Sequence, residues 1–423
     1  ALEVELSRIF LAYARDIQSG VLIPSSVDEG LVREVPLRPR KATLSAFSKS
    51  SANGFLKTLP PKSAEYARLM KEKMRFEKII GRGGWGEKVA AKSLKPGASN
   101  NSVLQLRNRL IAMGYLKRTP TNTYDNAIAD AVRTFQKDLG LAQDGVAGPR
   151  TMQAINTSAA TRLSQIVVAM ERERWINMPL GKRHIWVNVT DFHARIVDNG
   201  KITFQTRSVV GANDPERRTP EFSDVMDHMV VNPTWNVPRS IATKEYLPLL
   251  KQDPFAVSNL NIINVRGQIV SRAEMDFSEY DETNFPYDLK EPPSRGNALG
   301  LVKFMFPNRY NIYLHDTPAK SLFGREKRAF SHGCVRLNDP FDFAYALLAK
   351  QERNPKGFFQ STLATRKETV VSLKEPVPVH LVYRTAFTQA KGNIQFRGDV
   401  YGRDSKIWRA LSNAGVVLNA QRG

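Results

Sequence analysis

The 423-residue chain contains a single cysteine, Cys334, so it cannot form an internal disulfide. It also lacks any apolar run of about 18 residues, which a membrane-spanning helix needs. Its first residues, Ala1 to Val4, do not have the charged and apolar pattern of a signal peptide. These absences leave the cellular compartment open, and they leave a lone thiol whose role has to be accounted for.

Acidic residues are scarce relative to basic ones. The 41 Asp and Glu stand against 62 Lys and Arg, which gives a formal net charge of +21. Such an excess favours anionic partners. Because we find no Cys/His finger, helix-turn-helix or RNP-like aromatic motif, we do not expect nucleic acid to be the partner. An anionic cell-wall polymer or membrane face would suit the same charge, and the length predicts two to four domains.

The segment around Cys334, Ser331 to Asn338, has the alternation of an extended strand. Residues two apart share a face of a strand, so we expect His332, Cys334 and Arg336 to line a cleft while the apolar residues between them enter a core. Gly333 lacks a Cβ atom, which lets a substrate approach the thiol closely.

A second polar segment lies upstream, from Tyr310 to Asp316. Its alternation predicts a half-buried strand with Tyr313 and His315 on one face. A free thiol is only a few per cent ionised at neutral pH, and an imidazolium within hydrogen-bonding reach lowers its pKa. We therefore expect Cys334 and His315 to form a thiolate–imidazolium pair.

The residues His315 and Ser331-His332-Gly333-Cys334-Val335-Arg336 resemble the signature of the YkuD-type L,D-transpeptidase catalytic domain. The resemblance implies that Cys334 is the nucleophile and His315 its base. It implies supporting and oxyanion roles for His332, Gly333 and Asp316, and substrate contacts from Arg336, Tyr313, Ser331 and Trp235. Where many members have glycine after the upstream histidine, this chain has Asp316, so either its backbone carbonyl or its carboxylate is expected to orient the imidazole.

Two alternative roles for the thiol stay open. A single cysteine is often a small buried apolar residue. A zinc site built from His315, His332 and Cys334 is the second alternative, although His-x-Cys is not a usual ligand spacing. We expect neither a metal nor another cofactor.

The rest of the chain predicts an α+β multidomain protein. Residues 1–97 have helical periodicity and resemble the N-terminal scaffold of the large, YcbB-like periplasmic class of L,D-transpeptidases. Residues 98–158 resemble the three-helix peptidoglycan-binding domain of type 1, with a spacer that binds nothing as the alternative. The β-rich catalytic domain is expected at 162–374, with a capping insertion at 239–298, and a C-terminal segment at 375–423 is expected to pack on the scaffold.

The resemblance also implies a function in cell-wall biogenesis and cell shape. The expected reaction forms 3-3 cross-links between diaminopimelate residues of peptidoglycan stem peptides, through a thioester on Cys334 and with release of D-Ala. A cysteine hydrolase acting on wall peptides and a non-enzymatic wall-binding protein are the alternatives. Expected partners are the donor tetrapeptide, an acceptor amine, a carbapenem adduct at Cys334 and other wall-synthesis proteins. The expected location is the periplasm of a Gram-negative bacterium, with an upstream segment as a membrane anchor.

Overall fold

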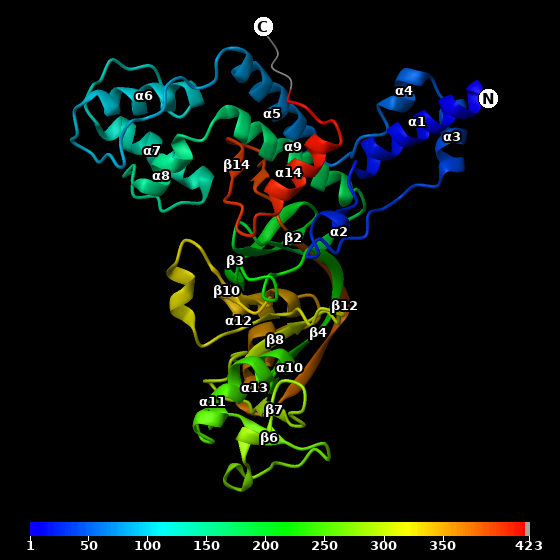
Figure 1. The fold of residues 1–423 in the computed structure, drawn as a ribbon, viewed down its shortest axis with the longest axis vertical. Coiled ribbons are helices and arrows are strands. Elements are labelled where there is room, and N and C mark those ends of the chain that lie inside the picture. Colours follow the sequence, from blue (N-terminus) through cyan, green and yellow to red (C-terminus); the bar gives the residue numbers. More distant parts are fainter. Residues whose placement is uncertain (419–423) are drawn as a thin grey trace.

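The computed structural model describes residues 1–418, so the end of the predicted C-terminal segment, 419–423, lies outside the described residues. The molecule has three lobes (Figure 1). A β-rich domain forms the stem, and two helical arms extend from its upper end. The expected α+β multidomain class is confirmed. None of the described helices is long and apolar enough to cross a bilayer.

The N-terminal region is helical, as predicted. One arm is built around a small core in which the rings of Phe10, Phe47 and Phe55 pack against one another. The chain then enters a longer amphipathic helix, whose first turn is capped by the Ser63 hydroxyl. The helices of this region are α1 (Leu2–Ser19), α2 (Pro24–Val27), α3 (Arg40–Ser48), α4 (Ala52–Leu56) and α5 (Ala64–Gly81).

The second arm is the expected three-helix unit, formed by α6 (Asn101–Met113), α7 (Asn126–Leu139) and α8 (Pro149–Ile155). Side chains of Asn100 and Asp125 cap the first two of these helices, and both helices end at a glycine in the left-handed conformation. The core of this arm continues into α5 and the connecting helix α9 (Ala159–Trp175). The three-helix unit is therefore packed firmly against the rest of the molecule.

The stem is a nine-stranded sheet in the order β10-β3-β11-β9-β8-β4-β12-β1-β2. Because β2 also pairs with β3, the sheet closes on itself, and its apolar side chains fill the interior. Its strands are β1 (Arg183–Asn188), β2 (His193–Asp198), β3 (Lys201–Gly211), β4 (Phe222–Val231), β8 (Val302–Met305), β9 (Leu314–His315), β10 (Ala329–Ser331), β11 (Val335–Leu337) and β12 (Thr369–Val382). The 3-10 helix η4 (Lys320–Gly324) follows β9, and the helices α12 (Pro340–Leu348) and α13 (Pro355–Ala364) connect β11 to β12.

The predicted capping insertion is a folded unit with its own apolar core, which includes Trp235, Leu250 and Phe285. It contains a second, three-stranded sheet in the order β5-β7-β6. Its elements are β5 (Trp235–Asn236), α10 (Arg239–Ile241), the π-helix η1 (Ala242–Tyr246), α11 (Leu247–Gln252), β6 (Asn261–Ile263), the short 3-10 helices η2 (Arg272–Glu274) and η3 (Phe277–Glu279), and β7 (Asp288–Glu291). It lies at the end of the stem away from the arms (Figure 1).

The boundary predicted between the catalytic domain and the C-terminal segment, at 374 and 375, falls inside strand β12. This strand lies between β4 and β1 and continues to Val382, so the sheet domain extends at least that far. Only after this strand does the chain leave the sheet, as β13 (Ala386–Phe387), β14 (Gln395–Phe396) and α14 (Arg403–Asn413). α14 packs on α9 and α2. The Arg403 side chain is fully buried there, between Asp28 and Glu221, and so ties the N-terminal region to the sheet domain.

Candidate active site

Cys334 lies at a break between two strands rather than within one. β10 ends at Ser331 and β11 begins at Val335, and between them Gly333 has φ +109°, which is unfavourable for any residue with a side chain. The expectation of one continuous strand with His332 and Cys334 on the same face is wrong for this reason. The alternation holds only from Cys334 onward.

Ser331 shapes this break. Its hydroxyl donates to the carbonyl of Cys334 and accepts the backbone N–H of Gly333 at 3.3 Å. The Ser331 side chain is buried, with 2% of its surface exposed. Contrary to the prediction from the sequence, Ser331 is therefore not placed to contact a substrate. Its side chain instead holds the loop that contains Cys334.

The other side of the loop is held by Thr219, which is fully buried. Its hydroxyl donates to the carbonyl of Gly333 at 2.7 Å and accepts the N–H of Gly211 at 2.9 Å. Among residues 1–418 the backbone N–H of Cys334 donates to no acceptor. A fixed loop with a free N–H beside the thiol can stabilise a developing oxyanion.

The Cys334 thiol is partly exposed and lies 3.4 Å from the carbonyl oxygen of Asn311, to which it donates. Burial raises the pKa of Cys334 to about 11. Hydrogen bonding from the backbone and side chain of Tyr313, and the charge of Arg336, oppose this rise in pKa without cancelling it. The thiol is therefore protonated at neutral pH in this state.

His315 lies on the strand next to the thiol. β9 and β11 run parallel with His315 opposite Arg336, and the His315 ring packs edge-on against Tyr313 at 5.6 Å. The imidazole is 4% exposed, and burial, followed by the charge of Arg336, lowers its pKa to about 3. The expected thiolate–imidazolium pair is thus absent from this state, in which both groups are neutral.

The predicted supporting residue Asp316 does not use its carboxylate on the imidazole. Its two oxygens accept the N–H groups of Leu301 and Thr317 and the ammonium of Lys320. The backbone of Asp316 lies near the His315 ring and raises the pKa of that ring. The backbone of Leu299 acts on that pKa in the same direction, so of the two alternatives left by the sequence the carboxylate is the one that the structure does not support.

Two groups in the site have no partner. The buried Nδ1 atom of His315 and the buried Nε atom of Arg336 make no hydrogen bond within the described part of the chain. No salt bridge of that part includes Arg336 either, and burial lowers the pKa of this guanidinium. Since a buried charge is costly without a partner, the site is suited to an anionic ligand group.

His332 turns away from the thiol toward the capping insertion. Its Nε2 atom lies 2.7 Å from the Glu245 carboxylate, which also accepts a hydrogen bond from Arg217 at 2.8 Å. Glu245 belongs to the π-helix η1, a kind of helix that occurs often at functional sites. The predicted supporting role of His332 therefore takes the form of a link between the catalytic loop and the cap.

Trp235 and Tyr313 lie where the cap meets the sheet domain. Trp235 is 8% exposed and packs edge-on against Tyr246, so most of its surface belongs to the core of the cap. Tyr313 contacts both the sheet core and the cap core. Of the two predicted substrate contacts, Tyr313 is therefore the one that borders both the sheet domain and the cap, whereas Trp235 is mainly part of the cap core.

The geometry for the zinc alternative is absent from residues 1–418, where no three His, Cys, Asp or Glu side chains converge. His332 would be needed as a ligand, but it is directed toward Glu245. Three residues that shape the site, namely Asn311, Thr219 and Glu245, were not expected from the sequence. Asn311 has the left-handed conformation that asparagine tolerates, which is the single local signal among the three.

The sequence of the β-rich domain matches a known family. Residues 182–371 match the family model of the YkuD L,D-transpeptidase catalytic domain. The chain therefore carries a YkuD-type L,D-transpeptidase domain. Residues 99–155 match the model of a peptidoglycan-binding domain, and residues 1–72 match a scaffold domain. These matches confirm the resemblance recognised in the sequence.

Two curated proteins are similar to this L,D-transpeptidase-domain chain. A Haemophilus influenzae protein named as a candidate L,D-transpeptidase is 34% identical over 265 residues, which are 62% of this chain and 53% of that protein. The N-acetylmuramoyl-L-alanine amidase CwlL of Bacillus licheniformis is 39% identical over 71 residues, which are 16% of this chain and 20% of the amidase. The chain thus spans about half the length of the first relative and a fifth of the second.

Solved structures of L,D-transpeptidases also align with the chain. That of Stackebrandtia nassauensis is 14% identical with a TM-score of 0.26, and the alignment covers 69% of this chain and 95% of that one. Residues 123–326 of the Xylanimonas cellulosilytica protein are 15% identical with a TM-score of 0.19, over 70% of this chain and all of the other.

Proposed function

We propose that this protein is a peptidoglycan L,D-transpeptidase that forms 3-3 cross-links through a thioester on Cys334. The observation that carries this proposal is the combination of a partly exposed thiol, a buried imidazole and the unpaired Arg336 guanidinium around one loop of a YkuD-type domain. A tetrapeptide stem offers both an amide to attack and carboxylates to bind.

In the first step the Sγ atom of Cys334 bonds to the carbonyl carbon of the amide between diaminopimelate and terminal D-Ala. The thiol proton passes to His315, and the free N–H of Cys334 stabilises the oxyanion. The C–N bond then breaks, His315 returns the proton to the leaving D-Ala amine, and a thioester remains. Since the free thiol donates to Asn311, it has to turn toward the imidazole before this transfer.

Substrate binding promotes the proton transfer. The charge of Arg336 is the second cause of the low pKa of His315. A stem carboxylate bound to Arg336 neutralises that charge, and charge-assisted pairs of this kind are strong and often bidentate. The imidazole then becomes a better base only when a donor stem is in place, which protects the free enzyme from unproductive ionisation.

In the second step a side-chain amine of another stem attacks the thioester. The amine loses a proton through His315, the Cys334 thiol is restored, and the 3-3 amide bond forms. Transfer to an amine rather than to water requires that water be kept from the thioester. The cap is suited to this task because Glu245 ties it to His332 beside Cys334.

Other parts of the proposal follow from the same assignment. The domain at 99–155 would hold the chain on peptidoglycan, and the protein would act in the periplasm of a Gram-negative bacterium. Carbapenems would acylate Cys334, since they are acyl donors to this family. Other wall-synthesis proteins would be partners.

The test supplies the purified chain with disaccharide-tetrapeptides and separates the products by liquid chromatography with mass spectrometry. Transfer predicts dimers that have lost one D-Ala, and both Cys334→Ser and His315→Ala should abolish them while leaving the fold intact. Trimmed monomers alone would establish a hydrolase, and unchanged substrate together with wall binding would establish a non-enzymatic protein.

A further inference from the structure

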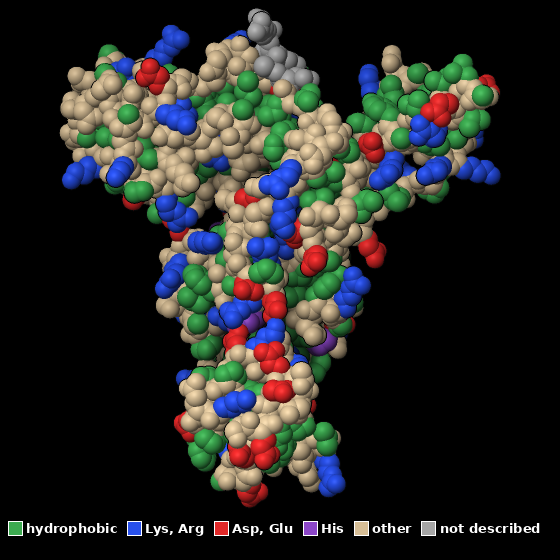
Figure 2. Space-filling view, viewed as in Figure 1, with side chains coloured by type: hydrophobic (Ala, Val, Ile, Leu, Met, Phe, Trp, Pro, Cys, Tyr) green, Lys and Arg blue, Asp and Glu red, His purple; other side chains and the backbone are tan. Residues whose placement is uncertain are grey.

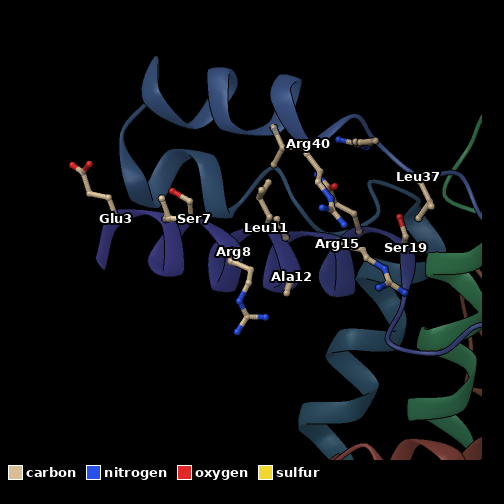
Figure 3. Close-up of a pocket in the computed structure, with 14 residues that line it drawn as sticks. Glu3, Ser7, Arg8, Leu11, Ala12, Arg15, Ser19, Leu37 and Arg40 are labelled. Carbon is tan, nitrogen blue, oxygen red and sulfur yellow. The ribbon is translucent and has the colours of Figure 1, made fainter. Parts of the chain in front are cut away.

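A cavity lies far from Cys334, in the N-terminal arm. It has a volume of about 730 Å³ and lies between α1 and the segment that leads into α3. Figure 3 shows Glu3, Ser7, Leu11 and Ser19 spread along α1, with Leu37 and Arg40 on the facing segment. This N-terminal groove has no part in the proposed reaction.

Its lining is strongly basic. Four arginines border it, and Arg8 pairs with Glu5 on its own helix. Arg15, Arg38 and Arg40 make no salt bridge or side-chain hydrogen bond with any described residue. Glu3 is the single acidic side chain in the lining. Three guanidinium groups without carboxylate partners around one groove therefore favour an anionic occupant.

The start of α3 adds to this charge. The first turn of α3 contains Arg40, has no acidic residue and has no side-chain cap. Cations are unfavourable at a helix N-terminus, where the free N–H groups and the helix dipole favour an anion. An acidic group in the groove would offset this conflict.

The groove also has an apolar component. Leu11 is half-buried in its floor, while Val4 and Leu37 at its margins are 74% and 67% exposed. Figure 2 shows hydrophobic and basic side chains intermingled over the arm that contains α1 and α3. Exposed apolar side chains rimmed by charges are typical of a surface that binds another protein.

We propose that the N-terminal groove binds an acidic, amphipathic segment of a partner protein. The lining runs from Glu3 to Ser19, which is about 24 Å along a helix and accommodates an extended segment of about seven residues. Carboxylates of the segment pair with the arginines, and its apolar residues contact Leu11 and Leu37. A membrane is a poorer fit, because it would meet convex faces whereas these arginines border a recess.

The experiment uses the full chain and a fluorescein-labelled peptide of about seven residues in which aspartate and leucine alternate. Binding is followed by fluorescence anisotropy at moderate salt. The test variant carries Arg15→Glu, Arg38→Glu and Arg40→Glu. A matched control carries the same charge change at three exposed arginines elsewhere, Arg82→Glu, Arg118→Glu and Arg266→Glu. Circular dichroism establishes that both variants are folded.

The proposal predicts that the wild-type chain and the control bind the acidic peptide, while the groove variant binds it at least about tenfold more weakly. A peptide with lysine in place of aspartate should not bind. Equal weakening in both variants would attribute binding to net charge alone and overturn the proposal. Absence of peptide binding would overturn it too. So would a chain that does not bind the peptide but binds phosphatidylglycerol vesicles through the groove arginines.

Discussion

Cys334 should react slowly with an alkylating reagent at neutral pH, and its rate should keep rising as the pH approaches 11. With a pKa of about 11, about one thiol in ten thousand is ionised at pH 7. An ordinary thiol with a pKa of 9.0 is ionised about a hundred times more often. A more basic thiolate is a better nucleophile, and over two pKa units this gains a factor of about eight. The net expectation is a rate about tenfold below that of an ordinary thiol.

The assay is direct because the chain has no other cysteine. Iodoacetamide is added between pH 6 and 11, and the rate is taken from intact-protein mass spectra. The same chain unfolded in urea supplies the control, since its thiol then has an ordinary pKa. Tyr313→Phe should slow the folded protein further, because Tyr313 lowers the pKa of this thiol. A rate that is already constant between pH 6 and 8 would show a stable thiolate–imidazolium pair and refute the reasoning.

Three further changes test separate parts of the site. Gly333→Ala should cost at least about 1–2 kcal/mol in urea unfolding and lower acylation, because a Cβ atom at φ +109° would lie 3.0 Å from Ile312; normal stability would contradict this. Glu245→Gln should change stability by less than about 1 kcal/mol but raise the share of hydrolysed product, whereas Glu216→Gln, which breaks another cap ion pair, should leave product ratios unchanged. His380 has its pKa lowered to about 4 by burial, so acid protonates the unfolded chain first, and this residue lowers stability from pH 6.5 toward 4 by up to about 3 kcal/mol. His380→Gln should weaken the pH dependence in urea titrations, and the part that remains is expected from His315, whose pKa is lowered in the same way.

Local sequence predicted the elements of the site well where packing follows the chain. Val335 and Leu337 enter the core as their alternation indicates. The three-helix unit could also be predicted from the sequence, because the capping residues and apolar stripes of its helices are local features. In such segments the periodicity and the end signals agree with the fold.

The sequence could not predict contacts between distant segments. Glu245 is 87 positions from its partner His332, and nothing in either segment indicates the pairing. Thr219 holds the Gly333 carbonyl from 114 positions away. The strand expected at 331–338 was interrupted because Gly333 adopts a backbone conformation that alternation alone does not reveal.

Burial explains why the expected thiolate–imidazolium pair of Cys334 and His315 is absent from the structure. The strand patterns and the family signature predict that the imidazole of His315 and the thiol of Cys334 form an ion pair. In the folded protein both groups lose solvent, which favours the neutral form of each and moves the pKa of Cys334 up and that of His315 down. The extent of burial depends on the closed sheet and the cap, which no local pattern specifies.

The most direct measurement is the intact mass of the full chain during turnover of a tetrapeptide muropeptide. The account predicts a transient adduct equal to the donor stem without its terminal D-Ala, located by digestion on the peptide that contains Cys334. The adduct should decay as cross-linked dimers appear and should be absent from Cys334→Ala. Dimers formed without an adduct, or by the Cys334→Ala variant, would contradict the central claim that this thiol carries the acyl group.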